Sequence, residues 1–230
     1  MTAVFPHDDT EQTLLETHTY VAGIDEVGRG ALAGPVCIGL TVLSKECGKA
    51  PGGIRDSKDL RPAKRAELAP LIRQWVQDWA VGWASAQEID AYGIVGGLRL
   101  ATWRALQEVE GRGHLPQVVI LDGSHDYLSP PADALFGDFP VSVCAPPSAM
   151  PKVLTEVKAD QRIQLVAGAS VIAKVARDTY MEELQDPGYD WKSNKGYASA
   201  RHVQGLKTLG VSEIHRRSWK LPGIVPTNLA

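Results

Sequence analysis

The 230-residue sequence has few cysteines, no long apolar run and almost no excess of charge, and each shortage excludes a class of protein. Its cysteines, Cys37, Cys47 and Cys144, form no Cys-x-x-Cys pair and are too few for a disulfide framework, which favours a reducing compartment. The longest uncharged stretch, Gly30 to Ser44, is shorter than the roughly 20 apolar residues that a membrane span requires. Because the N-terminus also lacks the basic and apolar regions of a signal peptide, we expect a cytoplasmic protein without a membrane partner.

The formal net charge of −3 would be unusual for a nucleic-acid-binding protein, but the charge is unevenly distributed. Residues 1–26 contain six acids and no Lys or Arg, whereas residues 190–220 contain seven Lys and Arg against two acids. A basic end beside an acidic pocket differs from a uniformly neutral surface. The distribution therefore leaves a polyanionic partner open.

Alternating strand-like and helix-like segments predict an α/β protein with one main domain, and the chain is long enough to bury a sizeable core. Residues 1–18 are polar without an apolar period, so we expect a mobile leader outside the fold. Apolar or β-branched runs predict strands over 20–25, 35–43, 80–84, 117–122 and 139–144. Apolar spacing predicts helices over 61–79, 85–109 and 161–184, the last with small residues suited to close packing on a sheet.

Four carboxylates lie where strands end or a helix begins, which is where ligand sites of α/β sheets form. Asp25 and Glu26 follow the first apolar run, Asp122 follows QVVIL, and Asp160 precedes the long helix. Clustered carboxylates stay ionised in a poorly hydrated pocket only if cations neutralise them, and oxygen ligands suit Mg²⁺ or Mn²⁺. The pattern predicts a metal site, which Glu26 shares with Asp25 only if the first strand breaks at Glu26. Helix caps or turns are the alternative use of such acids.

The loop after the first two acids is rich in glycine. Its sequence, GRGALAG, does not match the G-x-G-x-x-G of dinucleotide sites, and the two preceding acids would repel a pyrophosphate. Gly28 and Gly30 would instead let the backbone approach a polynucleotide closely, with Arg29 meeting a phosphate. A β-bulge with a solvated Arg29 is the alternative.

Several motifs in order resemble those of the ribonuclease HII family: GIDEVGRGALAGPV, DSKDL, ILDG, VKAD with ASVIAKVARD, and KGYASARH through GVSEIHRRSW. The resemblance covers about residues 20–220. It implies an α/β ribonuclease H-like fold with a mixed five-stranded sheet flanked by helices over 19–185, and a C-terminal helical substrate-binding segment over 186–230 packed on this core. It also implies hydrolysis of RNA in RNA–DNA hybrids and incision 5′ of single ribonucleotides in duplex DNA, leaving 3′-hydroxyl and 5′-phosphate ends.

The resemblance assigns two sets of site residues. The active-site carboxylates, which would hold two Mn²⁺ or Mg²⁺ ions during catalysis, are Asp25, Glu26, Asp122 and Asp160. The substrate-binding residues are Gly28, Arg29, Gly30, Lys58 and Tyr197. In this scheme the GRG loop senses the ribose 2′-hydroxyl, which is what distinguishes RNA from DNA. Lys58 contacts a phosphate, and Tyr197 stacks at the ribonucleotide–deoxyribonucleotide junction.

Two other functions remain to be weighed against a metal-dependent endoribonuclease. A phosphotransferase with Asp25 as nucleophile would need a second Asp two residues later, where Val27 stands. A catalytically silent nucleic-acid-binding domain would gain nothing from four buried negative charges. We therefore expect an enzyme, with a monomer as the default state. The sequence departs from the family pattern in a longer connection between Asp122 and Asp160, in KAD for KGD, and in DSKDL for DSKKL.

Other polar residues carry less specific patterns. Ser124-His125-Asp126 is contiguous, unlike a catalytic triad, and predicts a polar turn. His202 and His215 lack a metal-ligand spacing and are interpreted as solvated or hydrogen-bonding residues, or as minor phosphate contacts. The basic run HRRSWK either binds backbone phosphate or covers a helix terminus.

Overall fold

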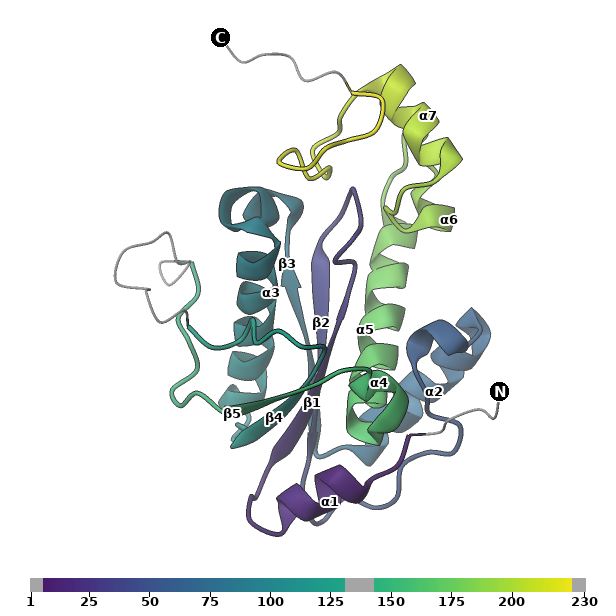
Figure 1. Cartoon of the computed structure of the whole chain (residues 1–230). Helices are drawn as coiled ribbons and strands as arrows, with labels where there is room; N and C mark the ends of the chain where they lie inside the picture. Colours follow the sequence, from purple (N-terminus) through teal and green to yellow (C-terminus); the bar gives the residue numbers. More distant parts are fainter. Residues whose placement is uncertain (1–5, 131–142, 225–230) are drawn as a thin grey trace.

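A computed structural model describes residues 6–130 and 143–224, and its centre is one five-stranded sheet (Figure 1). The strands are β1 (Val21–Val27), β2 (Val36–Leu43), β3 (Asp78–Ala84), β4 (Val118–Asp122) and β5 (Lys152–Glu156). Their order is β3-β2-β1-β4-β5, with β1, β2 and β3 antiparallel and β4 and β5 parallel to β1. The predicted mixed five-stranded sheet is therefore confirmed.

Helices cover both faces of this sheet (Figure 1). They are α1 (Asp9–Leu15), the short 3₁₀ helix η1 (Ser57–Asp59), α2 (Pro62–Trp75), α3 (Ala86–Gly111), α4 (Ala159–Arg162), α5 (Gln164–Glu183), α6 (Trp191–Asn194) and α7 (Ala200–Leu209). Helix α3 packs on one face, where its N-terminus has the expected capping box of Ser85 and Glu88, and α5 packs with α2 on the other. Among the described residues, no helix is both long and apolar enough to span a membrane.

Helix α5 lies unusually close to the sheet because two strand glycines have no side chain beneath it. A Cβ atom on Gly39 would lie 2.1 Å from the carbonyl oxygen of Ala169, and one on Gly23 would lie 2.7 Å from the carbonyl carbon of Leu165. The small residues of α5 do pack against these strands, as its composition predicted. This close approach places the start of α5 beside Gly23, two residues before Asp25, and Ala169 of α5 beside Gly39, the β2 partner of Asp25.

The fifth strand differs from the prediction. A strand was expected over 139–144, of which residues 139–142 lie outside the described residues, whereas β5 is formed by Lys152–Glu156. Strand β5 is an edge strand with partly exposed faces, and its apolar run consists only of Val153 and Leu154. So short a run does not stand out as a strand in the sequence. Strand β3 also begins at Asp78, two residues before the predicted start, and α2 ends correspondingly early at Trp75.

The N-terminal segment also differs from the prediction, because the described part of the expected leader belongs to the fold. Helix α1 buries Leu15, which is 2% exposed, and Glu11, which is fully buried. The Oε1 atom of Glu11 accepts a hydrogen bond from the backbone N–H of Leu165 at 2.9 Å, so α1 caps the start of α5. His7 forms a β-bridge with Ile163. Helix α1 is only seven residues long and buries Glu11 and Leu15 alone, so its sequence shows no apolar period. For this reason the segment was predicted to lie outside the fold.

Helices α6 and α7 lie at the end of the sheet opposite α1 (Figure 1). They enclose a small apolar cluster that includes Leu32 from the loop after β1. Backbone hydrogen bonds join this loop to the C-terminal segment: Leu32 N–H donates to the Gly196 carbonyl at 2.8 Å, and Gly34 N–H donates to the Ile214 carbonyl at 2.8 Å. Backbone hydrogen bonds therefore hold the C-terminal segment against the glycine-rich loop.

Candidate active site

The ends of two adjacent parallel strands bring Asp25 and Asp122 together. Strands β1 and β4 pair in a register in which Ile24 lies opposite Leu121, so the next residue on each strand is an acid. Each acid lies two residues after a position that packs under α5, Gly23 on β1 and Ile120 on β4. Side chains two residues apart in a strand share a face, so the acids leave the sheet on the α5 side. Asp25 is only 3% exposed.

Glu26 is placed differently from the prediction. Strand β1 does not break there but continues through Val27, which pairs with Cys37 of β2. Strand alternation therefore directs Glu26 away from the face of Asp25. Burial nevertheless raises the pKa of Glu26, the charge of Arg29 opposes this shift, and the charge of Asp122 adds to it. The Glu26 carboxylate thus lies within electrostatic reach of the cluster.

Asp160 reaches the same region from α4, directly before α5. The Oδ1 atom of Asp122 accepts a hydrogen bond from the Ala159 N–H at 2.8 Å, which fixes α4 against the end of β4. Lys58, from the predicted DSKDL motif, places its Nζ atom 3.4 Å from Oδ2 of Asp160 and 3.8 Å from Oδ1 of Asp56. Asp56 was not predicted as a site residue, although the motif contains it; it caps η1 and orients Lys58.

The carboxylates raise one another's pKa values. Burial raises the pKa of Asp25 well above its ordinary value, and the charges of Glu26, Asp122 and Asp160 add to the shift. Burial, together with the charges of Asp122 and Asp56, raises the pKa of Asp160 to about 6, against the opposing charge of Lys58. Perturbed carboxylates gathered at strand ends are characteristic of a functional site.

These acids do not form a preformed cage. Within the described ranges, no three acidic, histidine or cysteine side chains converge closely enough to hold a metal ion by themselves. Mg²⁺ is commonly held by one or two carboxylates, with water and substrate phosphates completing its coordination. The pair Asp25 and Asp122, with Asp160 nearby, fits that mode of binding and supplies the oxygen donors that it needs.

The glycine-rich loop lies between the carboxylates and Tyr197. The Gly28 N–H donates a hydrogen bond to the Tyr197 hydroxyl oxygen at 3.0 Å, across 169 positions of sequence. On the other side of the loop, Nη1 of Arg29 lies 3.3 Å from Oε1 of Glu26. The loop and the tyrosine predicted from the sequence are thus in direct contact, and Arg29 connects them to the acidic cluster.

Comparison with known proteins identifies the family to which this arrangement belongs. The family model described as ribonuclease HII matches residues 22–222. The chain belongs to the ribonuclease HII family. The ribonuclease HII of Streptomyces griseus is 44% identical over 213 residues, which cover 90% of this chain and 79% of that protein. The ribonuclease HII of Nitrosococcus oceani is 40% identical and covers 87% of this chain and 88% of its own length.

Solved structures agree with this assignment. The ribonuclease H2 of Pyrococcus horikoshii OT3 is similar with a TM-score of 0.57 and 26% identity, covering 88% of this chain and 94% of that one. The ribonuclease HII in a complex with PCNA from Archaeoglobus fulgidus is similar with a TM-score of 0.61 and 26% identity, covering 86% and 93%. The resemblance and the ribonuclease H-like fold are confirmed, and the protein is a ribonuclease H that acts on RNA–DNA hybrids.

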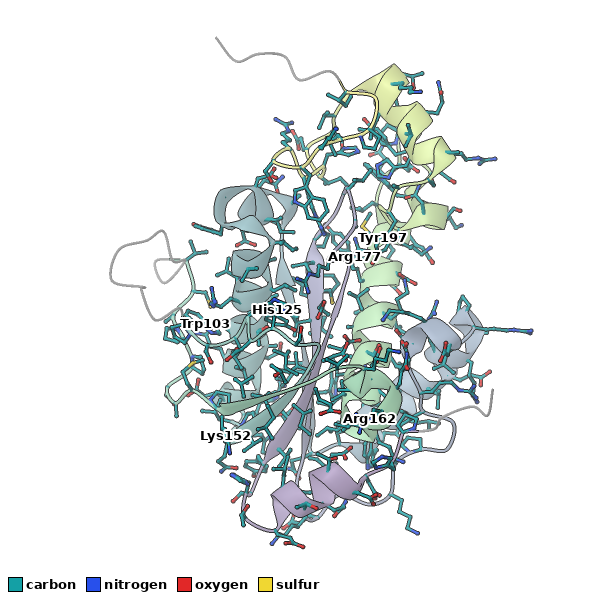
Figure 2. All side chains as sticks on the ribbon, viewed as in Figure 1. Trp103, His125, Lys152, Arg162, Arg177 and Tyr197 are labelled. Carbon is teal, nitrogen blue, oxygen red and sulfur yellow. The ribbon has the colours of Figure 1, made fainter. Side chains whose placement is uncertain are left out.

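Two buried arginines that sequence reasoning missed support the glycine-rich loop from below. Arg177 of α5 donates from Nε to the Pro35 carbonyl at 2.9 Å and from Nη1 to the Lys195 carbonyl at 2.9 Å. Its guanidinium carbon lies 5.4 Å from the centre of the Tyr197 ring, and Figure 2 shows the two side chains side by side. Arg216 is fully buried and donates to the carbonyls of Gly28 and Arg29, both at 2.7 Å.

Both interpretations of the run HRRSWK were therefore wrong for Arg216, which neither binds phosphate nor covers a helix terminus. The sequence did point to both arginines, since Arg177 lies in the motif ASVIAKVARD and Arg216 in GVSEIHRRSW. Basic side chains in the motifs of a nuclease family, however, suggest contacts with nucleic acid before they suggest a structural role. Because Arg216 is buried, it does not contribute to the positive charge that residues 190–220 present to solvent.

The histidines and the contiguous triad have structural settings. The Oδ1 atom of Asp126 accepts the backbone N–H groups of Leu128 and Ser129, both at 2.9 Å, so Ser124-His125-Asp126 is a polar turn as predicted. His202 and His215 are hydrogen-bonded to each other and are not solvated, since they are 0% and 1% exposed.

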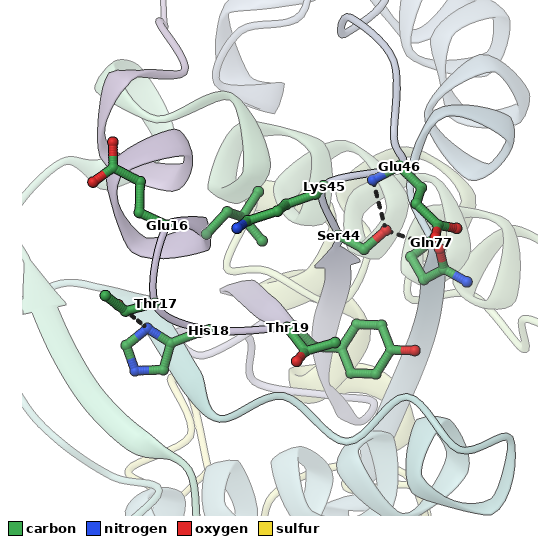
Figure 3. Close-up of a pocket in the computed structure, with 10 residues that line it drawn as sticks. Glu16, Thr17, His18, Thr19, Ser44, Lys45, Glu46 and Gln77 are labelled. Carbon is green, nitrogen blue, oxygen red and sulfur yellow. Dashed lines mark hydrogen bonds between the residues drawn. The ribbon is translucent and has the colours of Figure 1, made fainter.

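A separate hollow of about 400 Å³ lies far from the carboxylates (Figure 3). It is lined by residues that precede β1, follow β2 and precede β3, including His18, Lys45 and Gln77. Since the acids are at the other end of β1, this hollow is not part of the candidate active site.

Proposed function

We propose that this protein incises duplex DNA on the 5′ side of single embedded ribonucleotides, as well as cutting the RNA strand of hybrids, and leaves 3′-hydroxyl and 5′-phosphate ends. The observation that carries the proposal is a pair of neighbours. The carboxylates of Asp25 and Asp122 leave adjacent parallel strands on one face, and the loop that follows Asp25 is hydrogen-bonded to Tyr197. The proposed catalytic carboxylate Asp25 and the first glycine of the proposed ribose-binding loop, Gly28, are thus only three positions apart in the sequence.

Asp25, Asp122 and Asp160 would hold the divalent cations, Mg²⁺ or Mn²⁺, and Glu26, which lies within electrostatic reach of Asp25 and Asp122, would complete the set. The chemistry that two such ions supply is activation of the attacking water and stabilisation of the leaving oxygen at one phosphate. Burial and then the neighbouring negative charges raise the pKa values of Asp25 and Asp160, and bound cations would offset both effects, which supports this role. The monomer expected from the sequence stays a prediction.

The remaining predicted residues would bind substrate around this centre. Gly28 and Gly30 bring the backbone close to the ribose, where the 2′-hydroxyl is recognised. Tyr197 is partly exposed and can stack at the junction, and the Lys58 side chain is 72% exposed and free to meet a phosphate while it stays near Asp160. Arg29, which is about half exposed, can exchange its contact with Glu26 for a phosphate.

The test is incision of a DNA duplex that contains one ribonucleotide, in the presence of Mg²⁺ or Mn²⁺. The wild-type chain should cut 5′ of the ribonucleotide, and Asp25→Asn should lose at least about a hundredfold in rate because a metal ligand is removed. Asp9→Asn is the matched control, since the Asp9 side chain is 86% exposed on α1 at the far end of the sheet. Undiminished incision by the Asp25 variant, or no incision by the wild type, would exclude the proposal.

A further inference from the structure

The imidazoles of His202 and His215 form a buried pair behind Tyr197. His202 lies on α7 and His215 follows it in the next turn, and their Nε2 atoms are 3.0 Å apart. The rings of Tyr189 and Trp191 pack against His215, with centroids 4.7 and 6.2 Å away. The candidate site as described so far makes no use of this pair.

The partners of the pair determine where each proton sits. Two groups of Ser212 face Nδ1 of His215: the backbone N–H, which can only donate, at 3.0 Å, and the hydroxyl, which can donate or accept, at 2.7 Å. Both contacts are satisfied when this nitrogen carries no proton and the hydroxyl donates to it. The carbonyl of Tyr197 can only accept, and it lies 2.9 Å from Nδ1 of His202, so that nitrogen carries a proton. Neutral His215 must then be protonated on Nε2 and donate to the bare Nε2 of His202.

One chain of hydrogen bonds results, running from Ser212 through His215 and His202 to the Tyr197 carbonyl. An additional proton on either ring would place two N–H groups face to face across 3.0 Å. Burial, together with the neighbouring His202 and the charge of Arg217, lowers the pKa of His215 to about 4. The hydrogen bonds of the pair are therefore all satisfied by two neutral rings in one tautomeric arrangement.

This chain ends on a residue whose backbone has little other support. Tyr197 lies between α6 and α7, outside regular secondary structure, and follows Gly196, whose φ is +83°. Its N–H donates to the Asn194 carbonyl at 2.9 Å and its carbonyl accepts from His202, so both of its peptide groups are fixed. Fixing the two peptides aims the side chain at Gly28, where the hydroxyl accepts the backbone N–H.

We propose that His202 and His215 are positioning residues that hold Tyr197 in the orientation needed to read the ribonucleotide junction. The inference rests on the proposed function, in which Tyr197 contacts substrate. The histidines touch neither substrate nor the carboxylates; they act through the Tyr197 carbonyl. Their loss should therefore weaken substrate binding more than the chemical step.

Two substitutions of His215 separate this role from simple packing. In His215→Gln the side-chain nitrogen extends about as far as Nε2 and keeps a donor for His202. In His215→Asn the shorter side chain keeps an acceptor for Ser212 but loses His202. With the single-ribonucleotide duplex, we expect His215→Asn to raise KM about tenfold, the factor for one lost buried hydrogen bond, with kcat changed less than twofold. His215→Gln should stay within about twofold of wild type on both parameters by the same reasoning.

Tyr197→Ala and the double variant Tyr197→Ala with His215→Asn complete the cycle. If the histidines act through Tyr197, the double variant should have the KM of Tyr197→Ala alone. Equal effects of Asn and Gln at position 215, or a fall in kcat without a rise in KM, would overturn the inference. If Tyr197→Ala weakens binding and His215→Asn does not, the inference fails while the proposed function stands; if Tyr197→Ala has no effect, both fail.

Nitrogen NMR of the full chain labelled in histidine tests the arrangement without any activity measurement. At pH 7 we expect a protonated Nδ1 on His202 and a protonated Nε2 on His215, each with its other ring nitrogen bare. The reverse tautomers, or a charged ring in either residue, would overturn the inference even if the substituted proteins failed to fold.

Discussion

The Nη2 atom of Arg216 donates a hydrogen bond to the carbonyl oxygen of Gly28 at 2.7 Å, across 188 positions of sequence. The same guanidinium reaches the Arg29 carbonyl at 2.7 Å and the Gly34 carbonyl from two nitrogens, at 3.1 and 3.2 Å. A fork of five donors matches this set of converging carbonyls, which a single ammonium cannot do. The shape of the glycine-rich loop therefore depends on a residue from the C-terminal segment.

Arg216→Lys should weaken recognition while it retains the charge. A lysine supplies one point of contact where Arg216 holds three carbonyls, so the loop from Gly28 to Gly34 loses its fixed form. We expect KM for the single-ribonucleotide duplex to rise about tenfold or more, as for the loss of one or two buried hydrogen bonds, with a smaller effect on kcat. Steady-state kinetics on this duplex provide the measurement.

Arg217→Lys is the matched control for that substitution. Arg217 is adjacent in sequence and exposed, so the same chemical change there should leave the unfolding free energy and the loop unaffected. If both lysine variants changed KM equally, the contacts of Arg216 with the Gly28–Gly34 loop would not explain the effect, and the role assigned to Arg216 would be wrong.

Gly28→Ala should destabilise the fold, whereas Gly30→Ala should not. Gly28 has a φ of +88°, and a Cβ atom there would lie 2.0 Å from Nε of the buried Arg177. Gly30 has an ordinary backbone conformation and open space around the added atom. Urea unfolding should show a loss of about 2 kcal/mol or more for Gly28→Ala, combining backbone strain with a clash. Equal midpoints for the two variants would contradict this account of the loop.

Asp25→Asn should stabilise the protein in the absence of divalent cations. Burial raises the pKa of Asp25, and the charges of Glu26, Asp122 and Asp160 raise it further, so the ionised folded state is disfavoured. A group with a raised folded pKa contributes stability at low pH that is lost as the pH rises through that pKa. At pH 8, with a chelator present, we therefore expect the free energy of unfolding of Asp25→Asn to exceed that of wild type by about 1–2 kcal/mol, the effect of removing one like charge from a site. A less stable variant would show that Asp25 supports the fold as well as the site.

The sequence predicted the carboxylates of the candidate site better than the residues that hold the glycine-rich loop in place. Acids at the ends of apolar strands can be located from alternation and turn residues, and Asp25 and Asp122 directly follow the paired residues Ile24 and Leu121. The resemblance assigned both Gly28 and Tyr197 to substrate binding, but their contact was not predicted, because no local pattern encodes a contact across 169 positions.

Buried polar residues were the main source of error. Arg216 was expected at the surface, and for the histidine pair the sequence left solvation, hydrogen bonding and a phosphate contact open. Burial of a charged or polar side chain depends on partners that tertiary structure alone supplies. Glu26 shows the converse limit: the break expected in β1 did not occur, because the pairing of Val27 with Cys37 keeps the strand extended. Sequence patterns thus located the acids but could not orient them.

Glu11→Gln should make the protein less sensitive to pH, because Glu11 is fully buried and accepts only the Leu165 N–H. Burial raises the pKa of Glu11 to about 7 from an ordinary 4.5. The stability that this carboxyl contributes is thus complete below pH 4.5 and is lost as the pH rises through 7, at most about 3 kcal/mol in total. Unfolding at pH 5 and pH 8 should show that Glu11→Gln gains stability over wild type only at the higher pH. Glu16→Gln, an exposed position at the end of the same helix, should parallel wild type at both; a parallel course for Glu11→Gln would mean that α1 does not hold a buried carboxyl against α5.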